Sequence, residues 1–141
     1  MLPENGLSPE MTQYIGLARW DTPSQTLNLP GLQGGWFAMP DRGKAQAFQS
    51  RFAQANGNQP HPIAGLAYDG VAAIGALVKT GKRDALSRSG LTQSAGFQGV
   101  DGVFRLRGDG TNQRGLAVAT IRDSKVVILD PAPRGFGGAG F

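Results

Sequence analysis

Cysteine is absent from the 141 residues and histidine occurs once, so the side chains that most often act as nucleophiles, bases and metal ligands are scarce. The lack of cysteine excludes disulfides, thiolate metal sites and a cysteine nucleophile, although it leaves the cellular compartment open. The single histidine, His61, lies in a Gln-Pro-His-Pro segment, and no Ser/His/Asp arrangement of known spacing surrounds it. We therefore predict no catalytic residue, no metal, no cofactor and no enzymatic activity.

Long apolar runs are missing as well. The most apolar window, residues 63–78, is shorter than the roughly 20 residues that span a bilayer, and it contains Asp69. This window is predicted to be a buried helix rather than a membrane span. The first residues lack a basic segment followed by an apolar one, so we expect no signal peptide within this sequence.

Positive charge is present but not concentrated. The 14 Lys and Arg residues exceed the 10 Asp and Glu residues, yet they are scattered along the chain beside turns and on polar helix faces. A nucleic-acid-binding face needs clustered cations, so no nucleic-acid partner is predicted. The 40% hydrophobic content suffices for the core of one domain, and the 22 glycines predict many tight turns.

The first half of the chain alternates short apolar runs with amphipathic stretches. Residues 1–13 form a polar lead-in, and buried strands are predicted over 14–18 and 35–39. A helix should follow Asp41 and end at Gly57, with Phe48 and Phe52 on its apolar face. The next helix, 62–80, is apolar nearly all round and should be covered on several sides. Its glycines are expected where another backbone packs closely; these are Gly65, Gly70 and Gly75.

The second half changes to a period of two, which is typical of strands. Runs over 103–107, 116–121 and 126–129 predict a three-stranded antiparallel meander with turns at Asp109-Gly110 and Asp123-Ser124. The Arg-Gly-Asp tripeptide at 107–109, known from adhesion ligands, is therefore interpreted as turn chemistry. A glycine-rich tail follows at 137–141.

The order of motifs YIGLARWD, GGWFAMPD, AYDGVAAIGAL, GFQGVDGVFRLRGDGTNQRGLAV and VVILDPAP resembles the C-terminal part of the type I periplasmic solute-binding proteins. Within that family it is most similar to the branched-chain amino-acid-binding branch, which includes the outer-membrane lipoproteins described as penicillin-binding-protein activators. The resemblance covers Tyr14 to Phe136. It implies an α/β fold, namely the C-terminal portion of a two-lobed structure, with residues 14–136 forming the second lobe and the return to the first. We accordingly expect the chain to be a fragment whose first part, with its signal peptide, is missing.

The resemblance also implies where a ligand would bind. The family's second-lobe contacts come from the loop after the first strand and from the start of the helix that carries Tyr68. These positions are Ala18, Arg19, Trp20, His61, Pro62 and Tyr68. Arg19 is suited to a ligand carboxylate, while Trp20 and Tyr68 are either stacking residues of the pocket or aromatic residues of the core. Amino-acid binders of this family often carry an acidic residue near position 18, and this chain has Ala18-Arg19. The predicted ligand is thus an amino acid or a related compound, an anionic ligand, or none.

Two functions follow from the resemblance. The first is a periplasmic solute-binding component that delivers a small molecule to the membrane permease of an ABC transporter by lobe closure. The second is a ligand-free interaction module that regulates peptidoglycan synthesis by contacting a peptidoglycan synthase. In either case the apolar helix 62–80 would lack part of its covering, so we expect the fragment to associate with itself.

Overall fold

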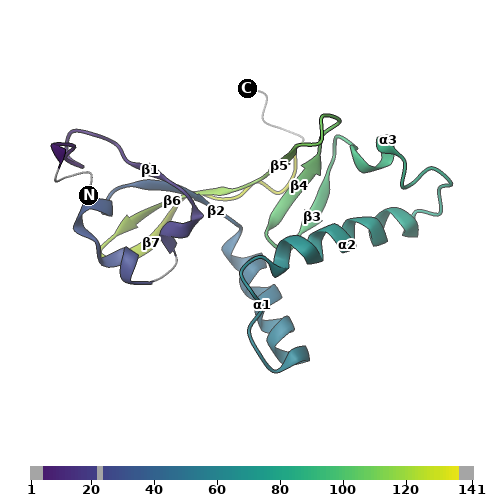
Figure 1. Ribbon diagram of the computed structural model, residues 1–141, viewed down its shortest axis with the longest axis horizontal. Coiled ribbons are helices and arrows are strands. Elements are labelled where there is room, and N and C mark those ends of the chain that lie inside the picture. Colours follow the sequence, from purple (N-terminus) through teal and green to yellow (C-terminus); the bar gives the residue numbers. More distant parts are fainter. Residues whose placement is uncertain (1–4, 22–23, 137–141) are drawn as a thin grey trace. The chain divides into compact units, whose positions relative to one another are not determined.

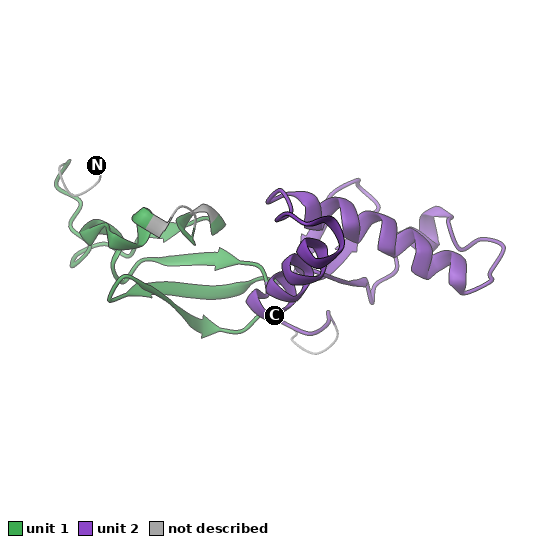
Figure 2. Ribbon diagram, turned by 90° about the horizontal axis from the view of Figure 1, so that it is seen from below, with its two compact units in different colours: residues 1–40, 116–132 green, residues 41–115, 133–141 purple. Residues whose placement is uncertain are grey.

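The computed structural model describes residues 5–21 and 24–136, which belong to two compact units (Figures 1 and 2). Unit 1 comprises residues 1–40 and 116–132, and unit 2 comprises residues 41–115 and 133–141. The chain passes between the units after Pro40, after Gly115 and after Ala132. Each unit has its own sheet and its own core, and the expected tail at 137–141 lies outside the described residues.

Unit 1 is built on a four-stranded sheet of order β1-β2-β6-β7. The strands are β1 (Ile15–Gly16), β2 (Trp36–Met39), β6 (Ala117–Arg122) and β7 (Lys125–Asp130). β1 pairs with β2 in parallel, and the other neighbours are antiparallel. The strand predicted at 14–18 is shorter because the Leu17 carbonyl accepts a hydrogen bond from the Trp20 amide, which turns the chain into the 3₁₀ helices described between β1 and β2. These are η2 (Ala18–Asp21), η3 (Ser24–Asn28) and η4 (Pro30–Leu32).

The core of unit 1 lies on one face of this sheet. Its fully buried side chains come from alternate positions of β2 and β6, as the two-residue period of a strand requires; they are Phe37, Met39, Ala117, Ala119 and Ile121. Partly buried Trp20, Leu27 and Leu32 from the 3₁₀ segment pack against them. On the opposite face Thr120 is also buried, and its hydroxyl has no hydrogen-bond partner among the described residues.

Unit 2 begins with helix α1 (Arg42–Asn56), whose ends confirm the prediction. The Asp41 carboxylate accepts a hydrogen bond from the Lys44 amide at 3.0 Å, which satisfies one of the free N–H groups of the first turn. Gly57 ends the helix with φ of 73°, a left-handed conformation that favours glycine. The unit continues with α2 (Ala64–Lys79) and the short α3 (Arg88–Leu91).

Helix α2 is not buried all round, so that prediction is wrong. One stripe at four-residue spacing is buried, formed by Gly65, Asp69, Ala73 and Leu77. The rest of the apolar surface is exposed, including Val71 at 73% and Val78 at 57%. A Cβ at Gly70 or Gly75 would meet nothing within 4 Å, and at Gly65 its nearest neighbours would be atoms of the Asp101 side chain, so close packing occurs only at Gly65 and there against a side chain instead of the expected backbone. The reason is that, within the described ranges, α2 packs mainly against β3, with Tyr68 also in contact with Phe48 on α1, while the remaining surface of the helix stays exposed.

The sheet of unit 2 is antiparallel and consists of β3 (Phe97–Gly99), β4 (Gly102–Leu106) and β5 (Asn112–Arg114). The predicted hairpin of runs 116–121 and 126–129 is present as β6 and β7, but the predicted pairing of run 103–107 with run 116–121 is wrong, and with it the single meander. β4 pairs with β3 and β5 in unit 2, whereas β6 pairs with β2 and β7 in unit 1. Alternation of apolar and polar residues identifies a strand and its buried face, but it does not specify which strands pair. The prediction from sequence therefore placed strands of two different sheets in one sheet.

Both predicted turns are confirmed. The Asp109 carboxylate accepts hydrogen bonds from the amide and the hydroxyl of Thr111 at 2.9 and 2.7 Å, and Gly110 has φ of 85°. These bonds to Thr111 hold the pKa of Asp109 below its usual value. At the β6–β7 turn, Asp123 and Ser124 both have positive φ, as a two-residue hairpin with the favoured twist requires.

Candidate functional site

The six predicted ligand contacts divide between the two units. Ala18, Arg19 and Trp20 lie in unit 1, whereas His61, Pro62 and Tyr68 lie in unit 2.

In unit 1, the predicted contacts lie on η2, directly after β1. Ala18 is exposed, and the Arg19 side chain lies outside the described residues. The Trp20 ring is half-buried, with its centroid 6.1 Å from that of Phe37. It also lies so close to Gly35 that a Cβ there would come within 2.7 Å of the ring. Trp20 therefore packs against the core of unit 1 and holds the 3₁₀ segment on the sheet.

In unit 2, the predicted contacts lie at the start of α2. His61 and Pro62 are exposed. The His61 carbonyl accepts a hydrogen bond from the Ala64 amide at 2.8 Å, and its Nδ1 accepts one from the Ile63 amide at 3.4 Å. His61 thus helps to begin the helix. Tyr68 is 51% exposed, and its ring centroid lies 5.2 Å from that of Phe48 on α1.

Tyr68 also lines a groove of about 290 Å³ within unit 2. The walls come from one face of α1, the first turns of α2, and the end of β3 with its following turn. The lining residues are Lys44, Ala47, Arg51, Tyr68, Asp69, Gln98, Gly99 and Val100. Of the sequence-predicted site residues, only Tyr68 belongs to this groove.

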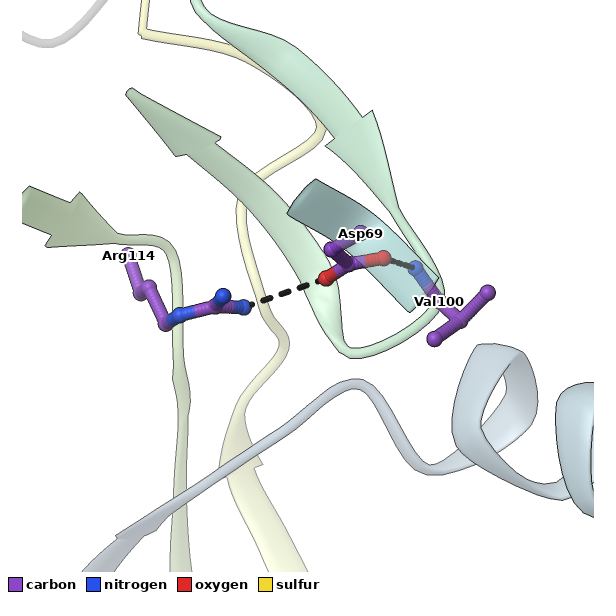
Figure 3. Close-up of polar contacts among 3 residues, drawn as sticks. All are labelled: Asp69, Val100 and Arg114. Carbon is purple, nitrogen blue, oxygen red and sulfur yellow. Dashed lines mark hydrogen bonds and ion pairs between the residues drawn. The ribbon is translucent and has the colours of Figure 1, made fainter. Parts of the chain in front are cut away.

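Next to Tyr68, Asp69 forms the most buried polar arrangement of unit 2 (Figure 3). Its side chain is 1% exposed, and its Oδ1 accepts a hydrogen bond from the Val100 amide at 2.6 Å. Its Oδ2 pairs with a guanidinium nitrogen of Arg114 on β5 at 3.3 Å. A buried carboxylate is costly unless it is paired and hydrogen-bonded, and here both oxygens have partners. Asp69 therefore fastens α2 to the sheet at two points.

Two glycines make this fastening possible. A Cβ on Gly99 of β3 would overlap the Asp69 carboxylate, so only glycine lets the strand approach it. Reciprocally, a Cβ on Gly65 of α2 would come within 2.7 Å of the Asp101 carboxylate. Burial raises the pKa of Asp101, the negative charge of Asp69 raises it further, and Arg114 opposes both effects. The Asp69 carboxylate of α2 thus lies against Gly99 of β3, and the Asp101 carboxylate of the β3–β4 turn lies against Gly65 of α2.

Sequence reasoning missed this arrangement. It treated Asp69 only as a charge that argues against a membrane span and gave Asp101 no role. A signal did exist for Asp69, because an acidic residue within an apolar helix needs a buried partner. Nothing in the local sequence pointed to Arg114, which lies 45 residues away.

Among residues 5–21 and 24–136, no three His, Asp or Glu side chains lie together in a way that could hold a metal ion. None of the helices in these ranges combines the length and the apolar character needed to cross a membrane.

Comparison with known proteins identifies the family. The sequence matches the family model described as periplasmic binding protein over residues 2–125. No curated protein matches the sequence significantly. Among solved structures, the chain is similar to a Rhodospirillum rubrum protein described as a branched-chain amino acid ABC transporter, with 19% identity and a TM-score of 0.67. The alignment covers 88% of this chain and 39% of the other.

Two further structures contain ligands. One is an ABC transporter substrate-binding protein from Desulfitobacterium hafniense in complex with Leu, with 20% identity, a TM-score of 0.51, and 82% and 35% coverage of the two chains. The other is a solute binding protein of an ABC transporter from R. palustris in complex with benzoate, with 20% identity, a TM-score of 0.51, and 89% and 37% coverage. The chain therefore spans about two fifths of the length of the structures it resembles. The match over residues 2–125 confirms the predicted resemblance: the chain belongs to the periplasmic-binding-protein family and has part of its two-lobed α/β fold.

Proposed function

We propose that this chain is part of the solute-binding component of an ABC transporter, a protein that works outside the cytoplasm and delivers a small molecule to a membrane permease. The observation that carries the proposal is the family match over residues 2–125. The division into two units that the chain connects three times supports it, because binding by lobe closure needs two bodies joined by several strands of backbone. The Leu and benzoate complexes of similar structures favour an amino acid or a related small acid as ligand.

The proposed contacts are those predicted from the sequence, with differing roles. Arg19 would pair with a ligand carboxylate, and the exposed part of the Tyr68 ring would lie against an apolar group. His61 and Pro62 would shape the approach to α2, while Ala18 would leave room for the ligand. Trp20 would act indirectly, because its packing against Phe37 positions η2. Since position 18 is alanine, the ammonium group of a free amino acid has no acidic partner there, which favours a ligand that is purely anionic.

Calorimetric titration tests this function. We expect benzoate or 4-methylpentanoate, the analogue of leucine without its amino group, to bind more tightly than L-leucine. Binding should be accompanied by compaction in small-angle X-ray scattering, because the proposed mechanism closes two units on the ligand. Tyr68→Ala should weaken binding by about tenfold, corresponding to the loss of one aromatic contact of roughly 1 kcal/mol or slightly more. Absence of binding across this panel, or binding with no change in scattering, would contradict the proposal.

A second candidate function rests on the exposed face of α2. Ala67, Val71, Ile74 and Val78 recur at three- and four-residue steps and form an apolar stripe whose large members are 48–73% exposed. Such a stripe is typical of an interaction surface. It suits an interaction module whose partner is a peptidoglycan synthase, and it equally suits association of the fragment with itself.

Light scattering distinguishes self-association of the chain from a monomer. Self-association should appear as a mass that rises with concentration, and Ile74→Asp should abolish the rise, whereas Lys79→Asp on another face of α2 should not. A constant monomer mass would exclude self-association. Retention of the chain on an immobilised peptidoglycan synthase, lost in Ile74→Asp, would then support the second candidate over the first.

A further inference from the structure

The groove of unit 2 is lined by two cationic side chains, Lys44 and Arg51, and by one buried carboxylate, that of Asp69. It is formed wholly by residues between 44 and 100 of one unit, so its geometry does not depend on unit 1. Lys44, Ala47 and Arg51 line it from α1. Positions separated by three, four and seven residues share one face of a helix, so the two cations point to the same side.

Lys44 is held in place by a neutral partner. Its ammonium group donates to the Gln98 side-chain oxygen at 2.7 Å, and the Gln98 amide nitrogen in turn donates to the Arg134 carbonyl at 2.8 Å. An amide oxygen positions the ammonium group without cancelling its charge. Two of the three ammonium protons remain available for another acceptor.

Arg51 is oriented in a similar way. Its Nε donates to the Ala47 carbonyl of its own helix at 3.3 Å, and this bond does not engage the two terminal nitrogens of the guanidinium. Within the part of the chain that the structure describes, neither Arg51 nor Lys44 pairs with an acidic side chain; the ion pair found there joins Asp69 and Arg114. The terminal nitrogens of a guanidinium match the two oxygens of a carboxylate.

Asp69 lies at the base of the groove but does not neutralise it. Its carboxylate is 1% exposed and is already engaged by Arg114 and by the Val100 amide. The exposed part of the groove therefore has two cations and no exposed anion among its lining residues. An anion entering it would gain both attractions and would face a carboxylate that is already compensated.

Tyr68 supplies an apolar wall beside these cations. One side of its ring meets Phe48, with a centroid distance of 5.2 Å, and about half of the side chain remains exposed. An aromatic surface next to positive charges suits a ligand that has both a carboxylate and an apolar body. The volume of about 290 Å³ lies at the small end of the range for small-molecule sites.

We propose that this groove is a binding site for a small organic carboxylate, in which Arg51 and Lys44 hold the carboxylate and Tyr68 lies against the apolar part. The site goes beyond the proposed function, because it lies in unit 2 alone and needs no closure between units. Arg51, Lys44 and Gln98 are absent from the contacts that the family resemblance implies. It thus assigns a specific role to one cationic face of α1.

Two-dimensional NMR titration of the full chain with phenylacetate tests the site. We expect the amide signals of Gly99 and Val100 to shift with saturation. Arg51→Gln and Lys44→Gln should each weaken the affinity by about tenfold, since a hydrogen bond to a charged group typically has that effect. Raising the salt concentration should weaken binding further. Phenylacetamide, which has the same shape without the charge, should bind far more weakly, and inorganic phosphate should bind without sensitivity to Tyr68→Ala.

Arg42→Gln is the matched control, because it removes one positive charge from the exposed side of the same helix without altering the groove. Equal weakening by Arg42→Gln, equal binding of phenylacetamide, or unchanged Gly99 and Val100 signals would each overturn the proposal. The test also separates this site from the proposed closure site. Phenylacetate binding that survives Arg19→Gln, fails in Arg51→Gln and occurs without compaction would support the groove even if the transport function were wrong.

Discussion

The two units differ in the kinds of side chain that they bury. The core of unit 1 consists of apolar side chains, and its one fully buried polar side chain within the described residues, Thr120, has a hydroxyl without a partner. The core of unit 2 combines apolar residues, among them Leu77 and Phe104, with the fully buried carboxylate of Asp69. In unit 2 the buried polar group is satisfied at both oxygens, whereas in unit 1 it is not.

This difference follows from the secondary-structure elements that each unit has to hold together. Unit 1 contains two six-residue strands joined by a hairpin, so its backbone hydrogen bonds specify the arrangement and the core only has to fill space. The strands of unit 2 have three, five and three residues, and a helix must be placed on them. Apolar packing is non-directional, so a directional group such as Asp69 is needed to determine where α2 lies.

The largest expected effect is in unit 1. Phe37→Ala should cost about 3–5 kcal/mol of unfolding free energy, because it empties a site that is 1% exposed and removes the surface on which Trp20 packs. Hydrogen exchange should show the loss of protection in β2 and β6. Phe52→Ala on α1, which is only partly buried, is the control and should cost clearly less. Equal losses would show that the core of unit 1 does not depend on apolar packing.

The second largest loss of stability is expected when the contacts of Asp69 with Val100 and Arg114 are removed in unit 2. Asp69→Ala should cost about 2–4 kcal/mol, because it leaves the Val100 amide and Arg114 without their partner; the 23% exposure of the Arg114 side chain moderates the loss. The Val100 amide should lose its protection from hydrogen exchange. Asp69→Asn keeps an acceptor for Val100 and should cost less than Asp69→Ala. A neutral effect of both changes would contradict a directional role for Asp69.

Gly99 and Gly70 differ in the space that is available to a side chain. Gly99→Ala should cost about 1–3 kcal/mol, since the new methyl group would overlap the Asp69 carboxylate and force the strand away from the helix. Gly70→Ala is the matched control, because a Cβ there meets nothing within 4 Å and should add about 1 kcal/mol of helix stability. Denaturant unfolding of the two variants should therefore shift in opposite directions. Shifts of the same sign would show that the approach of β3 to Asp69 is not constrained by Gly99.

The smallest effect concerns Asp101 and depends on pH. Because its pKa is raised in the folded state, the ionised carboxylate disfavours folding at neutral pH, and this cost is relieved as the pH falls through the folded pKa toward the ordinary value of 3.8. Asp101→Asn should therefore stabilise unit 2 slightly at pH 7, by less than about 1 kcal/mol after allowance for solvent screening. The gain should vanish below about pH 3. Thermal unfolding at both pH values measures it, and a destabilised variant at pH 7 would show that Asp101 has a partner in the folded state.

Much of the local structure could be predicted because its causes are local. The Asp41 cap, the Gly57 end of α1 and the turns at Asp109-Gly110 and Asp123-Ser124 depend on residues a few positions apart. The order of such elements along the chain was enough to predict the family, which the match over residues 2–125 confirms. The ligand contacts proposed from that resemblance stay predictions.

Other features could not be predicted because their causes lie far apart in the chain. Whether β4 or β2 pairs with β6 depends on which sheet each strand joins, and alternation is the same in both cases. The covering of α2 depends on what packs against it, so an apolar sequence such as that around Val71 could be expected to be buried and is nevertheless exposed.

Short-range backbone preferences and the order of motifs were enough to predict the caps, the turns, the two long helices, the longer strands and the family, but not the three-residue strands β3 and β5. Only the tertiary structure decided that Asp69 meets Arg114, that Gly99 must lack a side chain, and that Lys44 and Arg51 share a groove with Tyr68. The physical reason is that a buried charge selects its partner by position in space. That position exists only after the helix and the sheet have come together.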